Sequence, residues 1–448
     1  MTKQHHDNYS LISHSRQQQI LLLHEDTGWT MPRHHATMPA EINALMQTQL
    51  GLTTTVLSCI YDRYQDEEQE EQHRVYALEN HAPETLPPTN GRWIGRAELL
   101  DLPLMLPEHR AVLETWFAEN ESDQLRRQQS WAYPGWLATV RAWIDQQLVQ
   151  LGYVQAGPIE QVVVWMWSTV VRVPTTTGNL YLKATASVFD FEPVLTRMVA
   201  QLVPSSVPHV LAIDRQRCWM LMTDAGTGFR SGPHDPARSE EALRQYAQMQ
   251  IKLAAHAETL KAVGCPDRRL HLLPQLYQEI LAATPFLLID QPKGLPRDQY
   301  AQLLALVPQV EAMCEELASY NIPESLHHDD LHSGNMIDSG ERYVFIDLAE
   351  SCLTHPFCSL FIVLRDAKYT LKYDDQALGR LRQAYLAAWE GYEPMERLQR
   401  AFELAHRLGS LHRALTWYRF LLHLEPDWRW MYEDAALYFL QVFLGTEE

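Results

Sequence analysis

The residues most able to do chemistry in this 448-residue chain lie close to position 330. The segment His328–Asn335 reads His-Asp-Asp-Leu-His-Ser-Gly-Asn, and a strand-like stretch, Arg342–Ile346, follows it. Asp330 stands five residues before Asn335. This spacing fits a short loop that presents a carboxylate base to a hydroxyl group and an amide oxygen to magnesium. A hairpin through the strand would bring Asp347 back to the loop as a second metal ligand. These residue types and spacings predict a phosphoryl-transfer site.

Two other interpretations of this segment stay open at the level of sequence. His327, His328 and His332 could form a metal cluster, because two of them stand four residues apart, as on one face of a helix. Pro323 and Ser333-Gly334 argue against a helix here. The segment could also be a polar surface loop, which the strand and the aspartate that follow it make less attractive. The phosphoryl-transfer interpretation alone requires a lysine on an upstream strand, followed by a glutamate.

The required lysine is present upstream. Three segments read as consecutive strands: Val162–Trp167, Thr169–Val173 and Leu180–Lys183. Ser168 is expected in the first turn, and Lys183 at the end of the third strand has a charge that suits the α and β phosphates of a nucleotide. Glu192, nine residues further on at the start of a predicted helix, could hold this lysine in an ion pair.

Together these motifs resemble the aminoglycoside phosphotransferase family of protein-kinase-like enzymes, which phosphorylate small molecules. The resemblance extends over about residues 136–448. The family's loop commonly reads His-Gly-Asp-Leu-His-x-x-Asn, and this chain follows it with Asp329 in place of the glycine. The resemblance implies ATP and Mg²⁺ as cofactors and assigns these roles: Asp330 as catalytic base, Asn335 and Asp347 as metal ligands, and Lys183 with Glu192 as the phosphate-binding pair.

The same resemblance implies a hinge after the last strand of a small lobe. The segment Trp219–Asp224 runs from an apolar stretch into polar residues. Backbone groups of Met222, Thr223 and Asp224 would then contact the adenine edge of the nucleotide. The alternative is an ordinary core strand.

The chain departs from the kinase pattern at three places. The expected first hairpin turn, Trp167–Thr169, has no glycine, so Ser168 and the neighbouring amides are the candidate phosphate contacts. Ser359 replaces an aspartate that in the family supports the catalytic loop, and a hydroxyl accepts the same hydrogen bonds more weakly. Leu348–Glu350 follow Asp347 without a glycine or a phosphorylatable activation segment, which favours a small-molecule kinase with a permanently assembled site over a protein kinase.

The first 130 residues have a different pattern. Two strands and an intervening helix are expected: Gln19–His24, Thr54–Tyr61 and Ala40–Leu50. With the Trp-x-x-Pro turn in Gly28–Pro32, this order resembles a Nudix hydrolase domain over residues 10–118. The metal-binding glutamates of that family are absent, because Thr48 and Gln49 stand where two of them belong. We therefore expect a non-catalytic domain that binds a nucleotide or sugar fragment, covers the kinase cleft or dimerises; an unrelated small α/β domain is the alternative.

The predicted fold class is α+β, a bilobal protein-kinase-like fold preceded by the small α/β domain. Its expected parts are a degenerate Nudix-like domain at 10–118, a linker at 119–135, a mostly β small lobe with a leading helix at 136–226, and a helical large lobe with the catalytic loop at 227–448. Candidate acceptor contacts on the large lobe are Asp366, Tyr369, Trp417, Tyr418, Trp428 and Trp430.

Composition is consistent with a folded cytoplasmic enzyme. The chain is 46% hydrophobic and has 13 tryptophans, which excludes a disordered protein. A formal charge of −19 disfavours nucleic acid as a partner and is compatible with a cationic acceptor. No stretch is long and apolar enough to suggest a membrane span. The six scattered cysteines form no Cys-x-x-Cys pair and read as reduced thiols of the cytoplasm.

The predicted function is transfer of the γ-phosphoryl group of ATP to a hydroxyl of a small molecule: an aminoglycoside-like antibiotic, a sugar or an amino alcohol. The alternative is a kinase-like nucleotide-binding regulatory protein whose chemistry has decayed. The sequence does not distinguish among acceptors or between ATP and GTP. A homodimer is also an open expectation.

Overall fold

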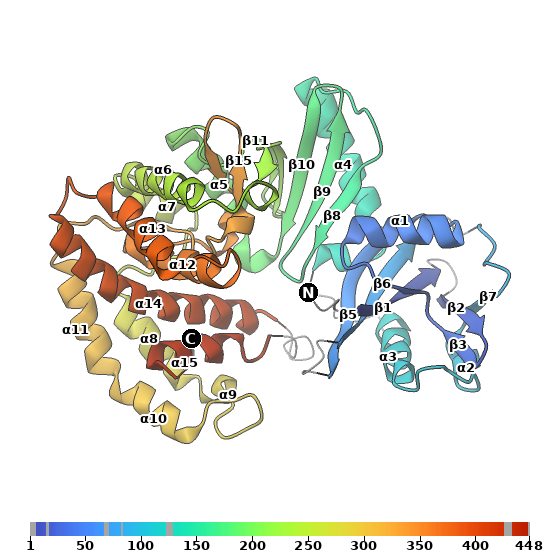
Figure 1. Ribbon diagram of the computed structural model, residues 1–448. Coiled ribbons are helices and arrows are strands. Elements are labelled where there is room, and N and C mark those ends of the chain that lie inside the picture. Colours follow the sequence, from blue (N-terminus) through green and yellow to red (C-terminus); the bar gives the residue numbers. More distant parts are fainter. Residues whose placement is uncertain are drawn as a thin grey trace. The chain divides into compact units, whose positions relative to one another are not determined.

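The structure, a computed structural model, describes residues 6–14, 18–66, 71–81, 84–121, 129–424 and 432–446. The chain divides into two compact units, Met1–Ala186 and Ser187–Glu448. Most of the long strands lie in the first unit and most of the helices in the second (Figure 1), so the predicted α+β class is confirmed. The finer boundaries at 118, 135 and 226 stay predictions, and residues 122–128 of the expected linker lie outside the described part. Among the described helices, none combines the length and the apolar character needed to span a membrane.

The first unit begins with a mixed sheet and its helices. Its elements are β1 (His6–His14), β2 (Gln19–Glu25), β3 (Gly28–Thr30), β4 (Arg33–His34), α1 (Pro39–Leu50), β5 (Thr54–Asp66), β6 (Glu71–Asn80), β7 (Gly91–Ile94), α2 (Arg96–Leu99) and α3 (His109–Glu121). The strand order is β3-β2-β1-β6-β5, with β4 beside β1 and β7 beside β2, and β1 runs parallel to β6. The two strands and the helix expected between residues 19 and 61 are all present.

This sheet has a core on each face because its side chains alternate between the two sides. On β1, Leu11 belongs to one buried cluster and Ile12 to the other. Trp116 of α3 packs in the first cluster, and Ile42 and Met46 of α1 pack in the second. The N-terminal part is therefore a sheet between two helices. Its likeness to a Nudix domain stays a prediction.

The rest of the first unit contains the predicted leading helix and three strands. Its elements are η1 (Ser130–Ala132), α4 (Trp136–Leu151), β8 (Glu160–Val164), β9 (Ser168–Thr175) and β10 (Gly178–Thr185). The three strands form an antiparallel ladder. Gly152 ends α4 in the left-handed conformation, with φ of 75°.

The first turn of this ladder lies two residues earlier than predicted. Trp165–Trp167 form the turn, which the Trp165 amide closes by donating to the Ser168 carbonyl at 2.8 Å. Ser168 itself is buried in β9 and pairs with Thr185 of β10. The error has a clear origin, since tryptophans have high strand propensity and serine is a frequent turn residue.

The second unit has 23 elements in the described residues. They are η2 (Ser187–Phe189), α5 (Glu192–Leu202), β11 (Val210–Asp214), β12 (Trp219–Thr223), β13 (Thr227–Gly228), η3 (Phe229–Ser231), α6 (Pro236–Ala254), α7 (Ala257–Ala262), α8 (Leu273–Ala282), α9 (Thr284–Leu287), α10 (Arg297–Ala305), α11 (Val307–Ala318), β14 (Ser325–His327), η4 (Ser333–Asn335), β15 (Met336–Asp338), β16 (Tyr343–Phe345), η5 (Leu348–Glu350), β17 (Cys352–Thr354), η6 (Pro356–Ser359), α12 (Leu360–Tyr369), α13 (Asp375–Ala387), α14 (Met395–Leu422) and α15 (Ala435–Leu444).

The 28-residue helix α14 runs through the helical unit, with α15 along it (Figure 1). It packs closely on η6 and α12 at Gly409. A Cβ atom placed on Gly409 would lie 2.5 Å from Cβ of Phe361 and 3.0 Å from the carbonyl oxygen of Cys358. The absence of a side chain at this position thus allows the two elements to approach.

We expect Gly409→Ala to lower the melting temperature. Overpacking at a rigid contact costs about 1–3 kcal/mol, which exceeds the gain of about 1 kcal/mol in helix propensity. Gly379→Ala on α13 is the matched control, because a Cβ there meets no heavy atom within 4 Å. The control should raise the melting temperature. Equal stabilisation by both substitutions, measured by circular dichroism, would contradict the close packing at Gly409.

Candidate active site

A short hairpin positions the two predicted metal ligands. Strands β15 and β16 are antiparallel, with Met336 opposite Phe345. Just before this pair, the Ile346 amide donates to the Asn335 carbonyl at 3.0 Å. Asn335 and Asp347 therefore flank the same end of the hairpin, as predicted from their spacing. Asp347 has a left-handed backbone, with φ of 66°.

A buried histidine joins the predicted catalytic loop to this hairpin. The Nε2 atom of His328 donates to the Ile346 carbonyl at 2.8 Å. Burial lowers the pKa of His328, so the ring is neutral and its Nδ1 atom accepts the Asp330 amide at 3.4 Å. The ring thus fixes the start of the loop relative to the residue preceding Asp347.

The carboxylate of Asp330, the predicted base, lies between two cationic or polar side chains. Its Oδ1 atom is 3.0 Å from Nη2 of Arg413, and its Oδ2 atom is 3.5 Å from Nε2 of His332. The amide nitrogen of Asn335 donates to the Asp330 carbonyl at 3.0 Å. Burial alone would raise the pKa of Asp330, but Arg413 and His332 outweigh it and hold this pKa below its ordinary value. Asp330 is therefore an anion with a fixed orientation.

Sequence reasoning missed Arg413, which is on α14. Its side chain is 8% exposed, and its Nη1 atom donates to the Glu350 carboxylate and to the Asp329 carbonyl, the latter at 3.3 Å. Burial raises the pKa of Glu350 to about 8. No local signal marks Arg413, because an arginine on an amphipathic helix normally faces solvent.

Asp329 has the left-handed backbone that a glycine adopts most easily, with φ of 61°. Its carboxylate is buried and contacts Thr416 Oγ1, Nη1 of Arg268 at 3.5 Å and Nε2 of His327 at 3.0 Å. Burial opposes ionisation, but His327 and the two nearby arginines hold the pKa of Asp329 well below its ordinary value. Hydrogen bonds and ion pairs to this carboxylate thus stabilise the backbone conformation.

His327 also contacts Ser359, which we predicted to stand in place of the family aspartate. The Nδ1 atom of His327 lies 2.9 Å from Ser359 Oγ, which Nε2 of Gln250 also approaches at 3.2 Å. The two ring nitrogens of His327 therefore contact a hydroxyl on one side and the Asp329 carboxylate on the other. The negative charge next to His327 is therefore that of Asp329, which belongs to the predicted catalytic loop.

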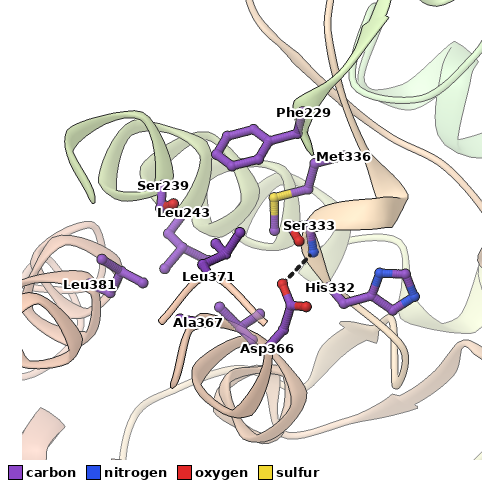
Figure 2. Close-up of a pocket in the computed structure, with 11 residues that line it drawn as sticks. Phe229, Ser239, Leu243, His332, Ser333, Met336, Asp366, Ala367, Leu371 and Leu381 are labelled. Carbon is purple, nitrogen blue, oxygen red and sulfur yellow. Dashed lines mark hydrogen bonds between the residues drawn. The ribbon is translucent and has the colours of Figure 1, made fainter. Parts of the chain in front are cut away.

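A second group of side chains fixes the far end of the loop. The Ser333 amide donates to Oδ2 of Asp366 at 2.8 Å (Figure 2). Arg230 donates from Nε to Ser333 Oγ at 2.7 Å and from Nη2 to Oδ1 of Asp366 at 3.0 Å. The adjoining cavity has a volume of about 10 Å³, which is room for one water molecule and not for an acceptor. The sequence suggested Asp366 as a candidate acceptor contact. In the structure its carboxylate accepts from the Ser333 amide and from Arg230, and these contacts position the loop.

The metal-cluster interpretation of the three histidines is wrong for the described residues, in which no group of three or more His, Cys, Asp or Glu side chains could hold a metal ion. His327 and His328 are committed to the contacts above. Figure 2 shows the ring of His332 directed away from the small cavity, and its Nδ1 atom accepts the Gly334 amide at 2.9 Å.

The remaining predicted site residues lie in both units. Lys183 is buried within β10 of the first unit, two residues before the end of the strand. Glu192 begins α5 of the second unit and is buried. Their ion pair stays a prediction, as does a role for Ser168 in phosphate binding.

The predicted hinge strand is present as β12. It includes Met222 and Thr223 and ends just before Asp224, whose Oδ1 atom accepts the Gly226 amide at 3.0 Å. Contact with adenine stays a prediction. Trp428 and Trp430, two of the candidate acceptor contacts, lie outside the described residues.

An aspartate held beside an asparagine and a second aspartate at the end of a hairpin is typical of phosphoryl-transfer proteins. The chain belongs to the phosphotransferase enzyme family, whose model matches residues 161–399, more than half of the chain. No curated protein matches the sequence significantly.

Several solved structures resemble the chain at low identity. A choline/ethanolamine kinase family protein from Mesorhizobium loti is 19% identical, with 68% of this chain and 94% of that chain covered and a TM-score of 0.45. A type I macrolide 2'-phosphotransferase is 16% identical, with 66% and 95% covered and a TM-score of 0.44. An aminoglycoside phosphotransferase from Streptomyces rimosus, in complex with ADP and streptomycin, is 17% identical, with 59% and 97% covered and a TM-score of 0.37.

We expect Asp329→Asn to destabilise the fold by about 3–5 kcal/mol near pH 7, because it leaves buried cationic partners without their anion. Since the folded-state pKa of Asp329 is lowered, its stabilisation is present above about pH 4 and is lost as the pH falls below that value. Urea unfolding of wild type and variant at several pH values should show a difference that shrinks only below about pH 4.

Asp290→Asn is the matched control. Asp290 also has a left-handed backbone, with φ of 58°, but its ion pair with Arg297 is exposed. An exposed pair contributes at most about 1 kcal/mol, so this variant should remain near wild-type stability. Equal losses in the two variants would contradict the stabilising role of the buried charge.

Proposed function

We propose that this protein transfers the γ-phosphoryl group of ATP to a hydroxyl group of a small molecule. The observation that supports this most directly is the position of Asp330, hydrogen-bonded to Asn335 at the end of the hairpin that leads to Asp347. Membership of the phosphotransferase family agrees with the proposal.

In the proposed reaction, Oδ2 of Asp330 accepts the hydrogen bond of the acceptor hydroxyl and orients its oxygen. The bond from this oxygen to the γ-phosphorus forms as the bond from phosphorus to the bridging oxygen of ATP breaks, and ADP leaves. The hydroxyl proton passes to Asp330 and then to water. Because Arg413 lowers the basicity of Asp330, orientation contributes more than proton abstraction, as suits a loose transition state.

The donor set near the hairpin fits Mg²⁺. Magnesium prefers oxygen ligands, and it is commonly held by one or two side chains together with substrate phosphates. The amide nitrogen of Asn335 is engaged by Asp330, which leaves its oxygen as the ligand atom, and the Asp347 carboxylate would complete the protein's share. When bound, the metal would neutralise charge on the phosphates.

The proposed nucleotide contacts rest on the sequence motifs. We infer that Lys183, oriented by Glu192, binds the α and β phosphates and that Ser168 contacts a phosphate near the first turn. Backbone groups of Met222, Thr223 and Asp224 would contact the adenine ring.

The short connection after Asp347 supports a small-molecule acceptor over a protein. Asp347 is followed at once by η5 and then by β17, which pairs with β14 directly before the catalytic loop. This connection has no room for an activation segment that phosphorylation could order. A site of this kind stays assembled without a switch.

We predict that Asp347→Ala abolishes the rise in melting temperature that Mg²⁺-ATP gives in the wild type. Ligand at a hundredfold excess over its Kd stabilises a protein by about 2.7 kcal/mol, which is readily measured. Asp338→Ala is the control, since this carboxylate lies at the other end of the same hairpin and pairs with Arg238. A shift in neither wild type nor control would favour the decayed, regulatory alternative.

Asp330→Asn should keep the shift with Mg²⁺-ATP and lose turnover by at least about a hundredfold, the usual contribution of a positioned acid or base. The measurement is ADP release with an accepted substrate, and the Asn side chain preserves the size of the group. Retained turnover would contradict the role assigned to Asp330.

A further inference from the structure

The charged groups around Asp330 differ in how far they reach solvent. Three neighbouring carboxylates, those of Asp329, Asp366 and Glu350, have side chains that are only 1%, 9% and 16% exposed, and each pairs with an arginine. None of these three is available to receive a cationic ligand without losing its partner.

Arg230, by contrast, is a charged side chain of this region that reaches solvent. Its side chain is 46% exposed, although Nε and Nη2 are held by Ser333 and Asp366. Within the described residues, its Nη1 atom makes no hydrogen bond. The guanidinium is also fixed against the loop, because a Cβ atom on Gly334 would lie 3.3 Å from its Cζ atom. A fixed, partly exposed guanidinium with an unused donor suits an anion.

One imidazole ring separates this guanidinium from the carboxylate of Asp330. The Nε2 atom of His332 lies 3.5 Å from Oδ2 of Asp330, and its Nδ1 atom lies 3.5 Å from Nη2 of Arg230. The side chains of His332 and Asp330 are 30% and 23% exposed. The three groups therefore form a continuous polar surface, with an anion-binding donor at one end and the hydroxyl-orienting carboxylate at the other.

Building on the proposed function, we propose that the phosphoryl acceptor is an alcohol that carries a carboxylate or phosphate group, which Nη1 of Arg230 binds while Asp330 orients the reacting hydroxyl. The acceptor would lie across His332. An ammonium group on the acceptor could not satisfy Nη1 of Arg230, because an ammonium is itself a hydrogen-bond donor.

The first experiment measures ADP release by the full-length protein with acceptors grouped by charge. The anionic group contains hydroxy acids, sugar acids and sugar phosphates, the neutral group sugars and nucleosides, and the cationic group choline, ethanolamine and kanamycin. We expect turnover with anionic alcohols. Turnover confined to the other two groups, or none in the anionic group although Mg²⁺-ATP raises the melting temperature, would overturn the proposal. The absence of any shift with Mg²⁺-ATP would instead contradict the proposed function itself.

The second experiment tests Arg230 with the best acceptor of each charge. Arg230→Gln should raise KM for the anionic acceptor by roughly tenfold or more, since hydrogen bonds to charged groups are the strong ones, and leave KM for ATP within about twofold. Arg230→Lys keeps the charge and should raise KM for the anionic acceptor less than Arg230→Gln does. Arg244→Gln, which removes a surface arginine paired with Glu240 and Glu241, is the control and should change neither constant.

A loss of kcat of equal size with every acceptor, at unchanged acceptor KM, would overturn the proposal. That result would mean that Arg230 acts on the loop or on the phosphoryl group and not on the acceptor.

Discussion

The buried carboxylate of Asp329 is the constraint on which the site depends. The backbone of Asp329 is in the left-handed conformation, which costs a residue with a side chain roughly 1–2 kcal/mol. The negative charge of its side chain would also be unfavourable in the interior without partners. Arg268, His327 and Thr416 supply those partners. The contacts of the buried carboxylate therefore hold the strained turn in place. Asp330 is the next residue in the chain, so the turn also fixes the direction of its side chain.

This dependence explains the role of α14 in the second unit. Arg413 and Thr416 are three residues apart and share one helical face, so a single helix contacts Asp330, Glu350 and the carboxylate of Asp329. The close packing of Gly409 on Phe361 fixes the same helix against α12, which carries Asp366. The loop is held from both ends by α12 and α14, elements far later in the sequence.

Local patterns predicted the parts of the site that local interactions determine. The spacing of Asn335 and Asp347 around a strand-like segment predicted the hairpin, because hairpins follow from neighbouring residues. The turn at Trp165–Trp167 was placed too late, since tryptophans there favour strands by propensity and only the hydrogen-bond register shows the turn. Arg413 had no sequence signal at all, because its burial depends on residues more than 60 positions away.

Asp330 is a weak base, because Arg413 lies 3.0 Å from its carboxylate. A hydroxyl group is a far weaker acid than any carboxylic acid, so such an aspartate gains little by removing a proton early in the reaction. It gains more by holding the acceptor oxygen in line with the phosphorus, and a loose transition state requires little nucleophilic strength from that oxygen. Under these conditions the catalytic benefit depends on how exactly the carboxylate is placed. The extensive use of buried charge around Asp329 and Asp330, which would be an expensive way to gain stability alone, is then understandable as a means of fixing one carboxylate in space.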